Sequence, residues 1–139
     1  MKKFKLFLSL FLLTVSSNIF AQSKTGQVYL IRSTGFEGSA VNHSFYLDDV
    51  LICKLKNQSY SIQDVPVGDH KISVVSGGLS NGKKSTPIVI TVVEGKPNFV
   101  EVVSTKKEEY SNQITAVEIL KNSADPILSK AKQITNCLH

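Results

Sequence analysis

Tryptophan is missing from this 139-residue sequence, and methionine, cysteine, histidine and arginine are scarce. Methionine occurs once, cysteine twice and histidine three times, and Arg32 is the single arginine. Aromatic residues make up only 8% of the chain. Carbohydrate-binding modules usually rely on exposed aromatic rings, which supply large apolar contact areas. The composition therefore gives little support to a carbohydrate-binding role, which remains an alternative.

The few residues that could bind metals or act as nucleophiles are poorly spaced for that chemistry. His43, His70 and His139 form no H-x-x-x-H pair, and the two cysteines form no C-x-x-C pair. Residues 78–82 do spell G-x-S-x-G around Ser80. A hydrolase needs this serine on a turn that leads from a strand into a helix, whereas a strand is predicted after it here. We therefore expect no cofactor, no metal and no enzymatic activity, with a small hydrolase as the less favoured alternative.

The first 21 residues have the pattern of a secretory signal peptide. Three lysines lie among the first five residues, Leu6–Val15 is mostly apolar, and a more polar stretch ends at Ala21. We expect cleavage after Ala21, the alternative being an uncleaved N-terminal anchor. The apolar run is shorter than the roughly 20 residues that span a bilayer. Residues 22–139 are therefore predicted to be periplasmic or secreted, without a transmembrane segment.

Removal of the signal peptide also changes the charge balance. The chain has 16 Lys and Arg against 11 Asp and Glu, and three of the lysines lie in the signal peptide, which leaves 13 against 11. So small an excess of positive charge offers little electrostatic attraction to nucleic acid. We expect no nucleic-acid partner, and instead an unidentified envelope protein or a small ligand.

The two cysteines would lie in a compartment that permits disulfides. Cys53 lies in an apolar stretch, where a lone cysteine behaves as a small hydrophobic residue. Cys137 is the third residue from the C-terminus, where chains commonly fray. Two free thiols are therefore the favoured prediction, and an intramolecular disulfide between Cys53 and Cys137 is the alternative.

Short β-prone segments separated by turns fill most of the remaining sequence. The predicted strands are residues 27–32, 45–47, 50–55, 59–65, 70–75, 87–93, 99–104 and 113–119. The first is apolar on both faces and should be central. Asp48-Asp49 and Pro66–Asp69 predict turns, the second joining 59–65 and 70–75 as a hairpin. The charged residues 106–109 predict a solvated turn.

A helix is predicted near the C-terminus, with Asp125 as its N-cap and Pro126 at its first position. Its apolar face would consist of Ile127, Leu128, Ala131 and Ile134. We expect this face to pack on the domain rather than on a membrane or a partner. Seven to eight short strands with a terminal helix predict a mostly β protein, a single antiparallel β-sandwich domain spanning residues 22–139.

Two polar residues are candidates for ligand binding. Arg32 ends the first predicted strand, where a salt bridge or a clamp on backbone carbonyls competes with an anion-binding role. His70 follows the Gly68 turn, with Asp69 beside it and Asp64 across the turn. We expect the His70 ring to hydrogen-bond the backbone of the turn, with ligand binding as the alternative.

Three segments, Gly26–Arg32, Phe45–Asp48 and Val65–His70, together resemble the domain of unknown function 2846 family of exported bacterial proteins. The pieces between Phe45 and Val74 also resemble PEGA-type β-modules, although Asp49 stands where those usually have glycine. Both resemblances imply a β-fold and neither supplies catalytic residues. The predicted function is that of an exported envelope or secreted domain, a non-enzymatic binding or accessory module. A carbohydrate- or peptide-binding module is the alternative.

Overall fold

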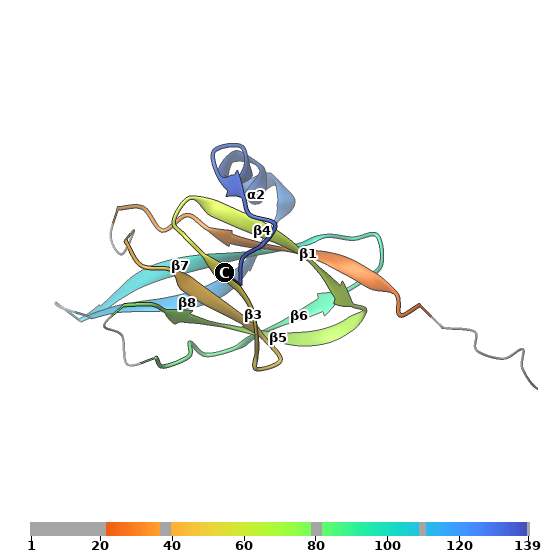
Figure 1. The fold of residues 1–139 in the computed structure, drawn as a ribbon, viewed down its shortest axis with the longest axis horizontal. Helices are drawn as coiled ribbons and strands as arrows, with labels where there is room; N and C mark the ends of the chain where they lie inside the picture. Colours follow the sequence, from red (N-terminus) through yellow and green to blue (C-terminus); the bar gives the residue numbers. More distant parts are fainter. Residues whose placement is uncertain (1–21, 37–39, 79–81, 109–110, 139) are drawn as a thin grey trace, which may run out of the picture.

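The computed structural model describes residues 22–36, 40–78, 82–108 and 111–138. The strands are β1 (Thr25–Arg32), β2 (His43–Leu47), β3 (Val50–Leu55), β4 (Ser59–Pro66), β5 (Gly68–Ser76), β6 (Ile88–Val92), β7 (Asn98–Glu108), β8 (Ser111–Ile119) and β9 (Lys132–Gln133), and the helix is α2 (Lys121–Leu128). They form a two-sheet β-sandwich with a short C-terminal helix (Figure 1), which confirms the predicted fold class. The predicted signal peptide, residues 1–21, lies outside the described residues, as does Ser80.

The larger sheet has the strand order β8-β7-β1-β4-β9, so β1 is central as predicted. Strand β1 runs antiparallel to β4 but parallel to β7. Its side chains alternate between the two faces of the sheet. Val28 and Leu30 enter the core between the sheets, while Tyr29 and Ile31 belong to a smaller cluster with residues of α2.

The smaller sheet has the order β3-β2-β5-β6. A tight hairpin joins β2 to β3 through Asp48 and Asp49, whose φ angles are 47° and 67°. Two successive left-handed residues are what the right-handed twist of a two-residue hairpin requires, and Asp tolerates this conformation better than most residues. The predicted Asp48-Asp49 turn is therefore confirmed.

The predicted hairpin around Pro66–Asp69 is wrong, because the segment carries the chain from one sheet to the other. Strand β4 ends by pairing with β1, whereas β5 begins by pairing with β6 and later pairs with β2. Val65 and Ile72 both enter the core, but from opposite sheets. Alternation along a strand shows which residues are buried and does not show which neighbour the strand pairs with.

The core between the sheets is almost entirely aliphatic. Its buried members are Val28, Leu30, Phe45, Cys53, Leu55, Val65, Ile72, Val74, Ile90, Val92, Val100, Val102, Ala116 and Cys137. A second cluster lies on the outer face of the larger sheet, where Ile31, Phe99 and Ala124 are buried. The helix thus packs on the domain, as predicted.

Both ends of the helix were predicted wrongly, since it ends at Leu128 and the expected face residues Ala131 and Ile134 lie beyond it. It begins at Lys121, directly after β8, and Asp125 and Pro126 lie inside it. Instead of capping the helix, Asp125 forms an ion pair with Lys121, whose Nζ is 2.7 Å from the Asp125 carboxylate. Burial of Ala124 against the sheet places the first turn earlier than the Asp-Pro signal suggests, because tertiary packing outweighs local propensity. No helix in the described ranges is long and apolar enough to cross a bilayer.

The predicted turn at residues 106–109 is also displaced. Strand β7 continues through Glu108 and pairs with β8 along its length. Charged residues have low β-propensity, but pairing with a neighbouring strand overrides that preference. The two strands together form the longest hairpin of the described structure.

The C-terminal segment is anchored rather than frayed. Strand β9 pairs in parallel with β4, and the amide of Lys54 donates to the carbonyl of Cys137 at 2.6 Å. Cys53 and Cys137 form a disulfide with Cα atoms 4.9 Å apart. The preference for two free thiols is therefore corrected in favour of the disulfide, because β9 brings the tail back to the sandwich.

Replacing Cys137 with serine should strongly destabilise the protein. The disulfide joins residues 84 positions apart, and restricting a loop of this size in the unfolded chain contributes up to about 4.5 kcal/mol. The loss should appear in urea unfolding curves. Reductant should destabilise the unsubstituted protein by a similar amount and leave Cys137→Ser unchanged. If the unfolding curves of the unsubstituted and Cys137→Ser proteins coincide in the absence of reductant, the disulfide does not stabilise the protein.

Candidate functional site

A two-sheet sandwich has two sides on which the edge strands of opposite sheets face each other. On one side, the C-terminal segment covers the edges of β3 and β4. The amide of Ile134 donates to the carbonyl of Tyr60 on β4 at 2.8 Å, and Cys137 forms the disulfide with Cys53 of β3. On the other side, β6 and β8 are the edge strands. Among the described residues, no such segment covers them.

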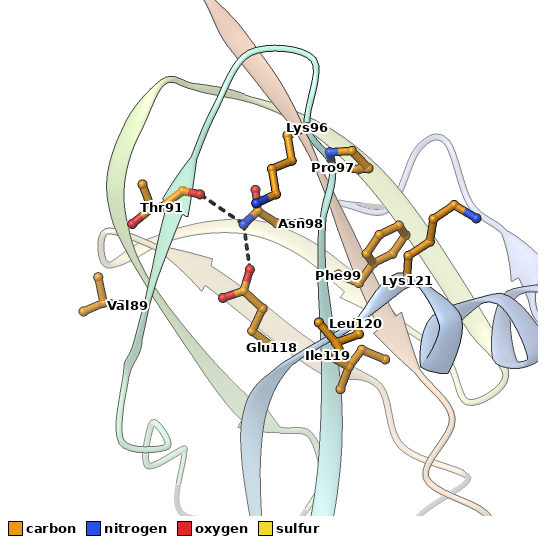
Figure 2. A pocket seen from close by; sticks show the side chains of 10 residues that line it. All are labelled: Val89, Thr91, Lys96, Pro97, Asn98, Phe99, Glu118, Ile119, Leu120 and Lys121. Carbon is orange, nitrogen blue, oxygen red and sulfur yellow. Dashed lines mark hydrogen bonds between the residues drawn. The ribbon is translucent and has the colours of Figure 1, made fainter.

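A groove of about 700 Å³ lies on this open side, between β6 and the adjoining ends of β7 and β8 (Figure 2). It is lined by Val89, Thr91, Lys96, Pro97, Asn98, Phe99, Glu118, Ile119, Leu120 and Lys121. Small-molecule and cofactor sites commonly have volumes of about 300–1,000 Å³ and combine apolar walls with a few polar groups. The groove has both properties.

Apolar side chains gather at this side of the molecule. Val89 and Leu120 line the groove and are 61% and 74% exposed. They are two of the eight large apolar residues that are exposed in the described part of the chain. Exposed apolar patches mark interaction surfaces more often than isolated residues do.

Asn98 links the two sheets at the floor of the groove. Its Nδ2 donates to the carbonyl of Thr91 on β6 at 3.1 Å and to Oε1 of Glu118 on β8 at 2.7 Å (Figure 2). Because the first residue of β7 makes both bonds, the opposing edges are held at a fixed separation. Nothing in the sequence marked Asn98, since an asparagine at a strand start usually belongs to a turn.

The two edge strands differ in what their backbones offer. The Thr91 carbonyl of β6 already accepts from Asn98. Along β8, no backbone hydrogen bond on the side away from β7 occurs within the described ranges. An edge strand with unpaired amides and carbonyls can accept an additional strand. Strand β8 is therefore the better platform for an extended ligand.

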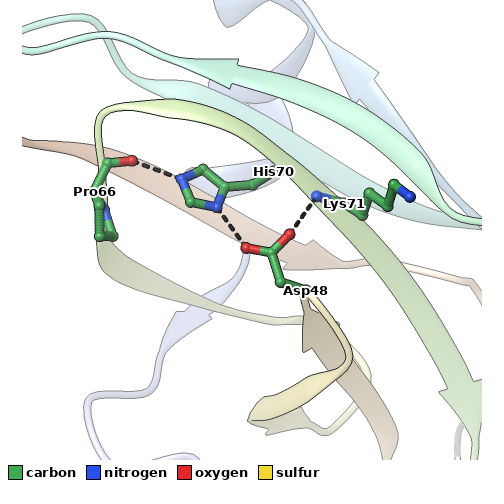
Figure 3. Close-up of polar contacts among 4 residues, drawn as sticks. All are labelled: Asp48, Pro66, His70 and Lys71. Carbon is green, nitrogen blue, oxygen red and sulfur yellow. Dashed lines mark hydrogen bonds and ion pairs between the residues drawn. The ribbon is translucent and has the colours of Figure 1, made fainter.

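His70 lies on β5, which pairs with β6, and its side chain connects three segments (Figure 3). Its Nδ1 is 2.7 Å from Oδ2 of Asp48, and its Nε2 is 2.7 Å from the carbonyl oxygen of Pro66. Asp48 Oδ1 also accepts from the amide of Lys71 at 2.9 Å. The predicted contact with the turn backbone is present. The carboxylate partner is Asp48, not the sequence neighbours Asp69 or Asp64.

Both nitrogens of the His70 ring face acceptors, so both must donate, and only the imidazolium has two N–H groups. The hydrogen bond to Asp48 raises the pKa of His70. The amide of Lys71, followed by His70, lowers the pKa of Asp48. His70 and Asp48 thus form an ion pair that holds the β2–β3 turn against the crossover at Pro66.

Arg32 binds backbone carbonyls, which is one of the two structural roles that the sequence suggested for it. It is fully buried, and its Nη1 donates to the carbonyls of Val41 and Leu55, the latter at 2.7 Å. An anion-binding role stays a prediction, and the burial of the side chain gives it no support. His43 is also buried nearby, and burial together with the charge of Arg32 lowers its pKa to about 4.

The candidate metal ligands and nucleophiles are not grouped in the described residues. Within them, no group of three or more His, Cys, Asp or Glu could hold a metal ion. The Cys53 and Cys137 thiols are consumed in the disulfide. His70 has both ring nitrogens engaged. The G-x-S-x-G serine, Ser80, lies outside the described residues.

Comparisons with family models, with curated proteins and with solved structures find no match. The resemblance to the domain of unknown function 2846 family and to PEGA-type modules therefore stays a prediction.

The stability contributed by His70 should depend on pH. Because folding raises its pKa, the contribution is complete below the ordinary value of 6.5 and is lost as the pH rises through the folded value. The pKa of Asp48 is lowered by folding, so the stabilisation is also lost as the pH falls below 3.8 and Asp48 becomes protonated. Hydrogen bonds to charged groups contribute about 1.5–3 kcal/mol, and Asp48 is half exposed. We expect His70→Ala to cost about 1–2 kcal/mol between these limits.

Urea unfolding of the unsubstituted and His70→Ala proteins across this pH range measures the difference directly. His70→Gln, which retains a donor but has no charge, is the control and should lack the pH dependence. If the difference in unfolding free energy between the unsubstituted and alanine proteins stays constant up to about pH 9, His70 does not act as an imidazolium, since even a histidine with a raised pKa would be neutral at that pH.

Proposed function

We propose that this chain is an exported, non-enzymatic binding domain that captures an extended polypeptide segment in the groove between β6 and β8. The observation that carries the proposal is the unpaired edge of β8 beside an apolar groove. Main-chain hydrogen bonds to an edge strand supply affinity, and the adjoining pocket supplies specificity. The signal-peptide pattern of residues 1–21 supports export, and the disulfide is compatible with an oxidising compartment.

An extended polypeptide is favoured over a sugar for two reasons. The chain's own C-terminal segment already occupies the equivalent position on the other side, where it forms β9 against an edge strand and packs Ile134 against the core. The sandwich thus accommodates that kind of occupant. By contrast, Phe99 is only 5% exposed and packs against Tyr29 at a centroid distance of 4.8 Å, so its ring offers no open platform.

Placing a carboxylate on an apolar side of the groove should weaken binding. Val89→Asp and Leu120→Asp alter exposed side chains, so we expect little effect on folding and at least about a tenfold loss of affinity, because burying an unpaired charge is costly. The measurement uses peptides selected from a random twelve-residue library on the processed chain. Binding is then compared by fluorescence polarisation.

Val50→Asp is the matched control, since Val50 is 64% exposed and lies in the β2–β3 hairpin, outside the groove. The control should bind the selected peptides like the unsubstituted protein. Equal affinities for all three variants would exclude the groove as the binding site. Failure of the library to yield any binding peptide would reject the proposed function itself.

A further inference from the structure

The predicted cleavage after Ala21 would leave a glutamine as the first residue of the processed chain. Gln22, Ser23 and Lys24 are all exposed and precede the first strand. Within the described ranges, neither Gln22 nor Ser23 forms a hydrogen bond or an ion pair. The α-amine and the side-chain amide of Gln22 would therefore be free to approach each other.

The fold first holds the backbone at Lys24, two residues beyond that glutamine. The carbonyl of Lys24 accepts from the amide of Val67 at 2.9 Å, and its Nζ is 3.3 Å from the carboxylate of Glu94. Strand β1 begins at Thr25 and lies between β7 and β4 in the larger sheet. A chemical change confined to residue 22 would leave these contacts unaltered.

We propose that Gln22 of the processed chain is converted to pyroglutamate. The nitrogen of the neutral α-amine attacks the side-chain carbonyl carbon, Cδ, and the bond between Cδ and Nε2 breaks. The product is a five-membered lactam. The side-chain nitrogen leaves as ammonia with the proton that the α-amine gives up. One amide replaces another, so the step needs no oxidant, reductant or cofactor. The proposal goes beyond peptide capture and does not depend on it.

Two chemical properties of an N-terminal glutamine favour this reaction. An α-amine has a pKa of about 7.7–8.0, so roughly a tenth of it is neutral and nucleophilic at pH 7. The amine and Cδ belong to the same residue, and intramolecular reactions are strongly favoured over the same step between separate molecules. An asparagine, whose side chain is one carbon shorter, would have to form a strained four-membered ring.

Loss of the α-amine would protect the contacts that hold the start of β1. Aminopeptidases recognise a free terminal amine, which the lactam lacks. Exposed chain ends are preferred sites of proteolysis, and Gln22 and Ser23 are exposed. Trimming through Lys24 would remove both the hydrogen bond from Val67 and the ion pair with Glu94. The modified end would resist that trimming.

The test expresses the full-length chain in a bacterium that exports it and examines the purified, processed protein. Its intact mass should equal that of residues 22–139 with the disulfide formed and one ammonia lost, and the lactam fraction should rise on incubation at neutral pH. Edman degradation should fail on this form. Treatment with a pyroglutamyl aminopeptidase should restore it, with Ser23 read first. Gln22→Asn is the matched control and should keep both its terminal amine and the ammonia.

Each other result would overturn the proposal. A processed chain that begins at Gln22 but keeps a free amine throughout the incubation would show that the ring does not form. Retention of the signal peptide, or cleavage at another position, would mean that Gln22 is not terminal. An equal loss of ammonia from Gln22→Asn would place the reaction elsewhere in the chain. None of these measurements bears on peptide capture, which the library selection tests separately.

Discussion

The disulfide between Cys53 and Cys137 holds the C-terminal segment across one side of the sandwich, and the remaining architecture depends on that closure. Cys53 is fully buried in β3 and Cys137 is 5% exposed, so the bond lies within the core it stabilises. β9 pairs with Ser59 and Tyr60 of β4, and the Cys137 carbonyl accepts from Lys54 of β3, so the C-terminal segment covers part of both edges on this side. Between β6 and β8, by contrast, no segment of the described chain covers the edges.

That open side is held at a fixed width by two features. At its corner, a Cβ on Gly26 would lie 2.7 Å from the carbonyl oxygen of Val93, so only glycine allows β1 to approach β6 so closely. Within the groove, Asn98 bonds both Thr91 and Glu118. The opposing edges can neither collapse together nor separate freely, and a groove persists where two sheets would otherwise close.

The sequence predicted the local structure well and the long-range contacts poorly. Alternation of apolar residues located most strands, and the turn at Asp48-Asp49 was predicted correctly. The crossover at Pro66 was mistaken for a hairpin, because periodicity does not reveal which strands pair. His70 was identified, but its partner Asp48 is 22 residues away. The groove was not predictable at all, since Asn98 and Glu118 meet only through the pairing of β7 with β8.

Asn98 is a polar residue at the start of a strand whose other core-facing residues are aliphatic. Its two donated bonds join the sheets, but its buried oxygen has no partner in the described structure, and an unsatisfied buried acceptor costs about 1–3 kcal/mol. An aliphatic residue there would join the neighbouring core without that cost, as Val100 and Val102 do along the same strand. An aliphatic side chain at residue 98 would, however, give up both bonds, to the Thr91 carbonyl and to Glu118, that tie β6 to β7 and β8. Asn98 therefore serves the sandwich through its two donated bonds, which hold the edge of one sheet to the other.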